Sequence, residues 1–313
     1  MPKEELTILG LKNIITNFEE KETNEYLYWG RNDNFNIYKT LFEGEEISEF
    51  KNMLLNTIKY SISNKEICKY DLEVSCDDVI EVIEANKVEN YAIINHKVRE
   101  EDIINIDSEV RLDKFNFIFF RMSMEIDNEI KQITIIKKFN KPRTVLQQAM
   151  KLSWLGNKMK RINEDIIYLD NQVDAFEYDG QFYVFNRNNF NTIFKFKDMY
   201  CKLIDKSSEF IENSDFINDP EAFIDKCKEN GHYVKKMSKA IIAKGFENIK
   251  QHKEKIPNVI NQYKLDIKID KDGKIIYEEE KINQILDLVL EHCVISALSD
   301  KRAIAKALEF EGE

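Results

Sequence analysis

The fold is decided around one stretch of the chain, Val173-Asp174-Ala175-Phe176-Glu177-Tyr178-Asp179-Gly180-Gln181-Phe182-Tyr183-Val184-Phe185. Two runs rich in aromatic and β-branched residues flank the pair Asp179-Gly180. Asp-Gly suits the positive φ angles of a tight two-residue turn. The stretch therefore predicts a β-hairpin in which residues 173–178 pair with residues 181–185.

More strands and one helix are predicted on the N-terminal side of this hairpin. Apolar runs favour strands over residues 35–42, 79–85, 91–96, 115–126 and 130–139. The last two are expected to pair with each other across Asp127-Asn128-Glu129. Residues 46–62 carry apolar side chains at helical spacing, which predicts a helix with one buried face: Ile47, Phe50, Leu54, Ile58 and Ile62.

Helices are predicted on the C-terminal side. Pro142 ends the preceding strand, and Thr144 with Gln147 fits a capping box, so a helix is expected over residues 144–162. Asn188 or Asn189 can cap a further helix, whose buried residues would be Phe190, Ile193, Phe194 and Cys201. Helical segments are also expected over 222–228, 234–253, 283–298 and 299–310, and a last hairpin over 265–269 and 274–277.

This order predicts an α+β protein with an antiparallel, strand-rich N-terminal half containing hairpins and a helix-rich C-terminal half. A boundary near residue 142 would separate a strand-rich region, residues 1–142, from a second region, residues 143–313. The chain has only 9 glycines and 4 prolines in 313 residues, so no flexible linker marks that boundary. A single compact unit is the alternative.

Signatures of catalysis and of cofactor binding are missing from the sequence. The five cysteines form no CxxC pair, and the histidines His96, His232, His252 and His292 are widely separated. Metal-ligand spacings and phosphate-binding glycine loops are absent as well. We therefore predict no catalytic residue, no metal and no cofactor. The chain also lacks a signal-peptide core and any apolar run of about 18 residues, so we expect a cytoplasmic protein that needs a partner to reach a membrane.

The distribution of positive charge is the most informative feature. The net charge is −11, yet residues 131–161 contain nine basic residues and no Asp or Glu. Residues 226–255 contain nine lysines and three glutamates. Clustered Lys and Arg neutralise phosphates and release counterions whatever the base sequence. These segments predict a surface that binds DNA, with Trp154 between Lys151 and Lys158 available to stack on a base.

The candidate phosphate contacts in the first segment are Lys137, Lys138, Lys141, Arg143, Lys151, Lys158 and Arg161. In the second segment they are Lys235, Lys236 and Lys239. Two alternatives stay open. The basic segments can face the chain's own acidic residues, in the monomer or across a dimer interface, and Trp154 can belong to a core stripe with Leu146, Met150 and Leu155.

Several motifs resemble the KwaB-like family of the bacterial Kiwa antiphage systems. Residues 166–169 and 172–176 match its Asp-containing strand, residues 181–185 its second strand, and Phe190-Asn191-Thr192-Ile193-Phe194 the start of its following helix. Residues 285–290 and 296–299 are similar to its closing helices. The resemblance covers the chain from about Phe115 to the end. Asn191 is a departure, because an acidic residue is expected there.

The resemblance implies an antiphage defence protein that binds DNA non-specifically, blocks phage replication or expression, and acts with a KwaA-like integral membrane protein. It also implies recruitment to the inner membrane through that partner, and we expect a homo-oligomer. Two rivals belong to other classes. One is a metal-dependent nuclease whose carboxylates converge only in the fold, and the other is an interaction protein whose basic face meets an acidic partner.

Overall fold

A computed structural model of the chain describes residues 8–33, 35–40, 46–71, 78–99, 104–105, 114–126, 128–139, 151–155, 158–162, 169–295 and 302–305. The chain divides into two compact units. Unit 1 comprises residues 1–70 and 77–195, and unit 2 comprises residues 71–76 and 196–313. The predicted boundary near residue 142 lies outside the described residues.

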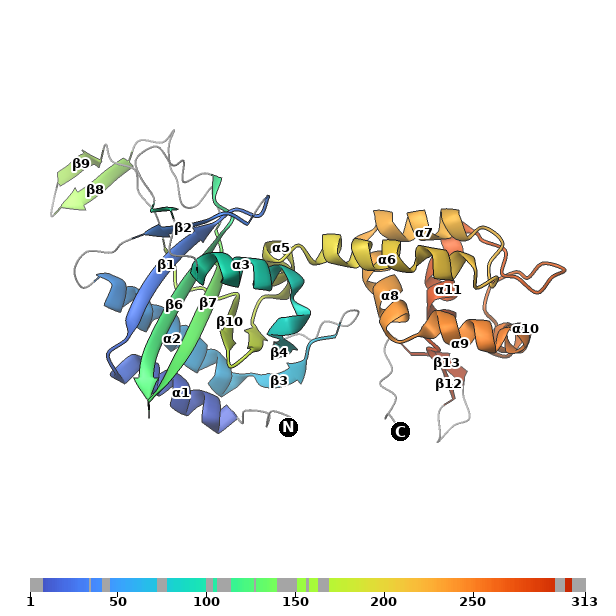
Figure 1. The fold of residues 1–313 in the computed structure, drawn as a ribbon, viewed down its shortest axis with the longest axis horizontal. Coiled ribbons are helices and arrows are strands. Elements are labelled where there is room, and N and C mark those ends of the chain that lie inside the picture. The colour runs from blue at the N-terminus through green and yellow to red at the C-terminus, as the bar shows by residue number, and fades with distance from the viewer. Residues whose placement is uncertain are drawn as a thin grey trace. The chain divides into compact units, whose positions relative to one another are not determined.

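Unit 1 is built on a nine-stranded sheet in the order β3-β4-β11-β10-β7-β6-β1-β2-β5 (Figure 1). Among its strand pairs, β2 with β5 and β3 with β4 are parallel, and the others are antiparallel. The strands are β1 (Asn24–Gly30), β2 (Ile37–Thr40), β3 (Glu66–Lys69), β4 (Val79–Glu84), β5 (Ile104–Asn105), β6 (Phe117–Ile126), β7 (Glu129–Lys138), β10 (Ala175–Tyr178) and β11 (Gln181–Val184). A separate two-stranded sheet pairs β8 (Lys151–Leu155) with β9 (Lys158–Ile162).

Helices cover both faces of the large sheet. On one face, α1 (Ile8–Glu20) and α2 (Glu46–Asn64) pack in a core with Leu27, Phe120 and Phe176. On the other face lie α3 (Glu89–Arg99) and α5 (Arg187–Ile193). Tyr91 of α3 lies 4.7 Å from the Phe182 ring, measured between centroids, and Phe190 of α5 lies 5.2 Å from it. Because both faces of the sheet are buried, the sequences of its central strands are nearly continuous apolar runs and do not alternate between apolar and polar residues.

Unit 2 is mainly helical. Its helices are α6 (Phe196–Glu212), α7 (Pro220–Glu229), α8 (Gly231–Ile242), α9 (Gly245–Gln251), α10 (Ile256–Tyr263) and α11 (Ile282–Val289). Phe216, Phe223 and Phe246 are buried together, with ring centroids about 6 Å apart. A short two-stranded sheet pairs β12 (Cys293–Ile295) with β13 (Arg302–Ile304). The α+β class is confirmed, with strands dominating the first half and helices the second.

The clearest sequence predictions are confirmed. The helix predicted over residues 46–62 is α2. The hairpin of β6 and β7 pairs Ile126 with Glu129. The hairpin of β10 and β11 pairs Tyr178 with Gln181, and the two turn residues, Asp179 and Gly180, have φ angles of 49° and 76°. Asp-Gly was the right pair for this turn because both positions need a positive φ.

Four predictions were wrong for the described residues. Residues 91–96 belong to helix α3, because Tyr91, Ile94 and Val98 are buried at helical spacing. Of the helix predicted over 144–162, residues 151–155 and 158–162 are the strands β8 and β9. Of the helix predicted over 283–298, α11 ends at Val289 and residues 293–295 form β12. Of the helix predicted over 299–310, residues 302–304 form β13. The strands of the last three cases are short, and in the first case a run of apolar residues concealed the helical period.

Other differences are smaller. The cap of α5 is Asn186, whose side chain accepts a hydrogen bond from the backbone N–H of Asn189 at 3.1 Å. The helix predicted to run on to Cys201 is interrupted at Lys195, where φ is 50° and α6 begins one residue later. The predicted hairpin at 265–277 is reduced to an isolated antiparallel bridge between Ile269 and Ile275. Helix α1 and strand β1 were not predicted.

Candidate nucleic-acid interface

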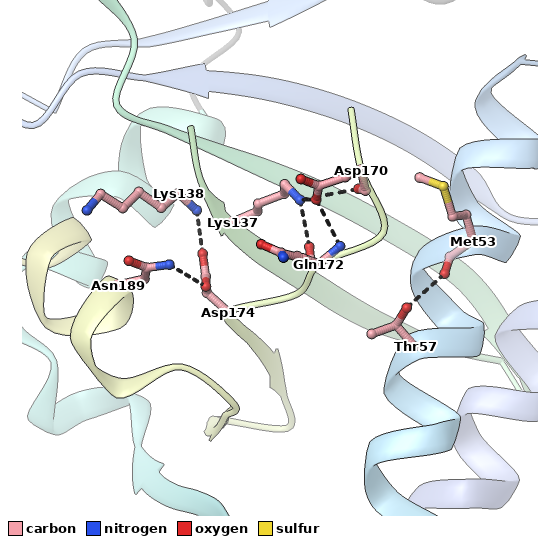
Figure 2. A network of polar contacts seen from close by, with 8 residues as sticks. All are labelled: Met53, Thr57, Lys137, Lys138, Asp170, Gln172, Asp174 and Asn189. Carbon is pink, nitrogen blue, oxygen red and sulfur yellow. Dashed lines mark hydrogen bonds and ion pairs between the residues drawn. The ribbon is translucent and has the colours of Figure 1, made fainter. Parts of the chain in front are cut away.

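Lys137, the first predicted phosphate contact, is a buried residue at the end of β7. Its ammonium group pairs with the Asp170 carboxylate and donates to the backbone oxygens of Asp170 at 3.2 Å and Gln172 at 3.0 Å (Figure 2). Burial lowers the pKa of Lys137 to about 8, and the charge of Asp174 opposes that shift. All three acceptors lie in the segment that leads into β10, so this lysine fixes that segment to β7.

The strand alternation of β7 contained the signal that Lys137 is buried. Ile133, Ile135 and Phe139 belong to the core under α1 and α2. Since alternate residues of a strand lie on the same face, Lys137 shares that face with them. Lys138, the next residue, lies on the opposite face and is half-buried.

Asp174, the acidic residue of the family-like motif, links three elements. Its carboxylate accepts hydrogen bonds from the backbone N–H of Lys138 at 2.6 Å and from the Nδ2 of Asn189 at 2.8 Å (Figure 2). Its backbone oxygen accepts the N–H groups of Phe185 and Asn186. Burial raises the pKa of Asp174, and the two hydrogen bonds counteract this rise. Asp174 thus joins the end of β7 to the hairpin of β10 and β11 and to the start of α5.

Beyond residue 139, the structure describes the first basic segment, residues 131–161, only in the hairpin of β8 and β9. Its register pairs Leu155 with Lys158 and Ser153 with Lys160. The two residues between the strands in sequence are Gly156-Asn157, a pair typical of tight hairpin turns, and this was the signal that the helix prediction missed. Residues 151–162 contain Lys151, Lys158, Lys160 and Arg161 and no acidic residue.

The start of β9 faces solvent. Lys158 is exposed, and Met159 has 61% of its surface exposed. Lys141 and Arg143 lie outside the described residues. The hairpin therefore carries four of the basic residues on a two-stranded element.

The second predicted set lies on α8 in unit 2. Lys236 is buried and pairs with Asp287 at 2.5 Å, and it also donates to the backbone oxygen of Asn283 at 3.2 Å. The Nζ of Lys239 lies 3.1 Å from the Asp71 carboxylate. Lys235 is half-buried. Lys236 and Lys239 are thus each held by a carboxylate of the same unit.

Other lysines of the second basic segment are paired in the same way. Lys226 pairs with Glu229 and Glu279, Lys228 with Asp205 and Asp225, and Lys253 with Asp215. This arrangement matches the alternative in which basic residues face the chain's own acidic ones. Lys244 and Lys250 are exposed. Much of the excess positive charge of residues 226–255 is therefore neutralised within unit 2.

Two more buried polar groups lie on the α3 and α5 face of the sheet, and sequence reasoning missed both. Arg187 pairs with Glu81 at 2.7 Å, and its Cζ lies 4.3 Å from the centre of the Tyr70 ring. Glu177 accepts hydrogen bonds from the hydroxyl of Tyr91 at 3.1 Å and from the backbone N–H of Gly180 at 2.8 Å. Burial raises the pKa of Glu177. These pairs hold helices and strands that are far apart in sequence.

The carboxylates near Lys137 do not form a metal centre in the described geometry. Asp174 already accepts from two donors, and Asp170 is paired with Lys137. Within the described ranges, no group of three His, Cys, Asp or Glu side chains is arranged to hold a metal ion. The network is therefore organised as a structural joint between strands. No described helix is long and apolar enough to cross a membrane.

These observations define an α+β protein of two units with a polar joint at Asp174 and a basic hairpin beside it in sequence. The sequence model described as Kiwa protein KwaB-like matches residues 112–299, more than half of the chain. The chain belongs to the KwaB-like family and is thus a component of the Kiwa antiphage system. The match spans β6 through β12 and includes both the joint and the basic segment. No curated protein and no solved structure matches the chain.

Proposed function

We propose that this protein is an antiphage effector that binds DNA non-specifically and acts with a membrane-embedded KwaA-like partner to block phage replication or expression. The observation that supports DNA binding is the run of nine basic residues without one acidic residue at positions 131–161, inside the family match, in a chain of net charge −11. In the proposal, cations concentrated in this way neutralise phosphates and release counterions.

The hairpin of β8 and β9 is the element that we assign to the DNA. A two-stranded ribbon fits the major groove of B-form DNA, where it can track the backbone without reading bases. The acidic remainder of the chain repels the duplex elsewhere, which limits contact to the basic element. The proposed contacts are Lys138, Lys141, Arg143, Lys151, Lys158, Lys160 and Arg161, with Lys235 as a further contact in unit 2.

Lys137, Lys236 and Lys239 have another role in the proposal. Each ammonium group is already opposite a carboxylate. Moving Lys137 or Lys236 to a phosphate would leave Asp170 or Asp287 without its cation, and separating a buried pair is costly. These three lysines therefore support the fold on which the DNA-contacting residues are placed.

Binding of a labelled 30-base-pair duplex, measured by fluorescence anisotropy at several salt concentrations, tests the proposal; about 30 base pairs gives roughly 100 Å of B-form axis. The variant Lys158→Glu/Lys160→Glu reverses two charges on the hairpin. The matched control Lys202→Glu/Lys206→Glu makes the same charge change at exposed positions of α6. We expect weaker binding to every duplex sequence for the hairpin variant alone. Equal losses in both variants would show that total charge, rather than the hairpin, governs affinity.

The same proposal includes a homo-oligomer that is cytoplasmic and is recruited to the inner membrane by the partner. Co-expression with a KwaA-like membrane protein, followed by membrane fractionation, tests the recruitment. Light scattering of the purified protein tests the oligomer. Adding magnesium or manganese to the DNA samples separates binding from cleavage, because a nuclease would shorten the duplex.

A further inference from the structure

An aromatic cluster in unit 1 holds an arginine in an unusual position. The ring of Phe115 lies 5.6 Å from the ring of Trp29 and 5.4 Å from the ring of Tyr38. The Cζ of Arg31 lies 5.3 Å from the centre of the Tyr38 ring and 5.6 Å from that of Phe115. Trp29 and Tyr38 are directly paired across β1 and β2. Side chains at the end of β1 therefore gather around one phenylalanine.

Two nitrogen atoms of this cluster are buried without a hydrogen-bond partner among the residues that the structure describes. They are the indole Nε1 of Trp29 and the guanidinium Nε of Arg31. Trp29 has 2% of its surface exposed. Both groups are donors only. A buried donor that has lost water without gaining an acceptor is unfavourable, so each position calls for an acceptor that the described chain does not supply.

Other buried cations of the chain show what is missing. Arg187 has the Glu81 carboxylate, Lys51 has Glu25, and Lys236 has Asp287. In the described part of the chain, the contacts of the Arg31 guanidinium are with the two aromatic rings. Stacking on rings uses the faces of a guanidinium and leaves the N–H groups at its edge free to bind an anion. Among the described residues, Arg31 is thus held against two rings with no carboxylate paired to its guanidinium.

We propose that Arg31 and Trp29 form a binding site for a phosphate group. The Nε–H of Arg31 and the Nε1–H of Trp29 donate to its oxygens, and the guanidinium supplies the opposite charge. Phosphate suits the site because a tetrahedral group offers acceptors in several directions to donors from two side chains. The ring of Trp29 also lies 5.0 Å from that of Phe139, so the indole is fixed by contacts with Phe115 and Phe139.

The phosphate can belong to a free nucleotide or to the backbone of a nucleic acid, and the chemistry of the site is the same for both. The inference does not depend on the basic hairpin, because Trp29 lies in β1 and Arg31 directly follows that strand. It concerns a binding site and no reaction.

The indole N–H resonance of Trp29 reports binding directly. The chain has two tryptophans, so Trp154→Phe assigns the Trp29 signal in a ¹⁵N-correlated spectrum of the full chain. Titrations use inorganic phosphate, deoxyadenosine monophosphate, a short duplex, and chloride and acetate at matched ionic strength. We expect a saturable downfield shift with phosphate and with the nucleotide, and no saturable shift with chloride or acetate.

Arg31→Gln should abolish the shift, and Arg31→Lys, which keeps the charge but loses the planar donor, should weaken it. Lys39→Gln is the matched control, because it removes one positive charge from β2 on the face opposite Trp29, and it should bind normally. The absence of a saturable shift, an equal response to acetate, or a full response in Arg31→Gln would overturn the inference. A response to phosphate without DNA binding would refute the DNA proposal alone, and DNA binding with an unresponsive Trp29 would refute only this site.

Discussion

Replacing Asp174 should destabilise unit 1 more than any exposed substitution in the same sheet. The carboxylate accepts hydrogen bonds at 2.6 Å and 2.8 Å from two donors on different elements. Hydrogen bonds to charged groups contribute about 1.5–3 kcal/mol each. Burial raises the pKa of Asp174 and so offsets part of this gain. We therefore expect Asp174→Ala to lower the free energy of unfolding by about 3 kcal/mol.

Asp174→Asn should be much milder. Its amide oxygen can accept the backbone N–H of Lys138, and Asn189 can turn its own amide to present an oxygen to the new NH₂ group. The cost of burying a charge also disappears. We expect a loss of about 1 kcal/mol, since two neutral hydrogen bonds replace two charged ones while the cost of burying the charge is removed. Glu125→Ala, at an exposed position of β6, is the control and should change stability by less than about 0.5 kcal/mol.

Urea unfolding followed by tryptophan fluorescence measures these differences in unit 1 alone, because Trp29 and Trp154 both belong to it. With a slope of about 2 kcal/mol per molar urea, Asp174→Ala should shift the midpoint down by roughly 1.5 M. Equal losses for the Ala and Asn variants would refute the reasoning, because the charge and not the pair of hydrogen bonds would then be the stabilising feature. A loss below about 1 kcal/mol for Asp174→Ala would refute the joint itself.

Three further predictions use other contacts. Arg187→Met should lower the free energy of unfolding by about 3–5 kcal/mol, because the buried Glu81 carboxylate loses the guanidinium with which it pairs. The double variant Glu81→Leu/Arg187→Met should restore much of that loss. A double variant as unstable as Arg187→Met in the same urea assay would contradict this reasoning. Gly30→Ala should lower the free energy of unfolding by about 1–3 kcal/mol, because a Cβ at this position would overlap the Phe117 ring. An unchanged urea midpoint would show that the ring moves aside. Burial opposes the charge of Asp287, but hydrogen bonds from His292 and Lys236 outweigh it and lower the pKa of Asp287 below its ordinary 3.8. The ionised Asp287 therefore stabilises unit 2 above that value, and this stabilisation is lost as the pH falls through the folded-state pKa. The thermal stability of unit 2, followed by far-UV circular dichroism, should fall below about pH 4 in the wild type and less steeply in Asp287→Asn.

The salt dependence of DNA binding gives a quantitative prediction for the hairpin. Each phosphate contact contributes about −0.9 to the slope of log K against log salt. Lys158→Ala/Lys160→Ala should therefore flatten the slope by about 1.8 if both lysines contact phosphates. Lys202→Ala/Lys206→Ala should leave the slope unchanged. A parallel loss of affinity without a change of slope would place these lysines outside the DNA contact.

The sequence by itself determined the parts of this protein that depend on local chemistry. Asp179-Gly180 specified its hairpin because that turn requires positive φ angles, and the apolar face of residues 46–62 specified α2 because helical periodicity is a short-range property. The motifs around Asp174 also identified the family, which the match over residues 112–299 confirms.

Only the tertiary structure decided which charges are free and which are paired. Lys137 and Lys158 look alike in sequence, but Lys137 is buried on the core face of β7 and paired with Asp170, whereas Lys158 is exposed on β9. Lys236 meets Asp287 across 51 residues of sequence, and Arg187 meets Glu81 across 106. No local pattern encodes such partners, because the attraction between two charges depends on their distance and burial in the folded chain, and these are fixed only when the strands and helices pack.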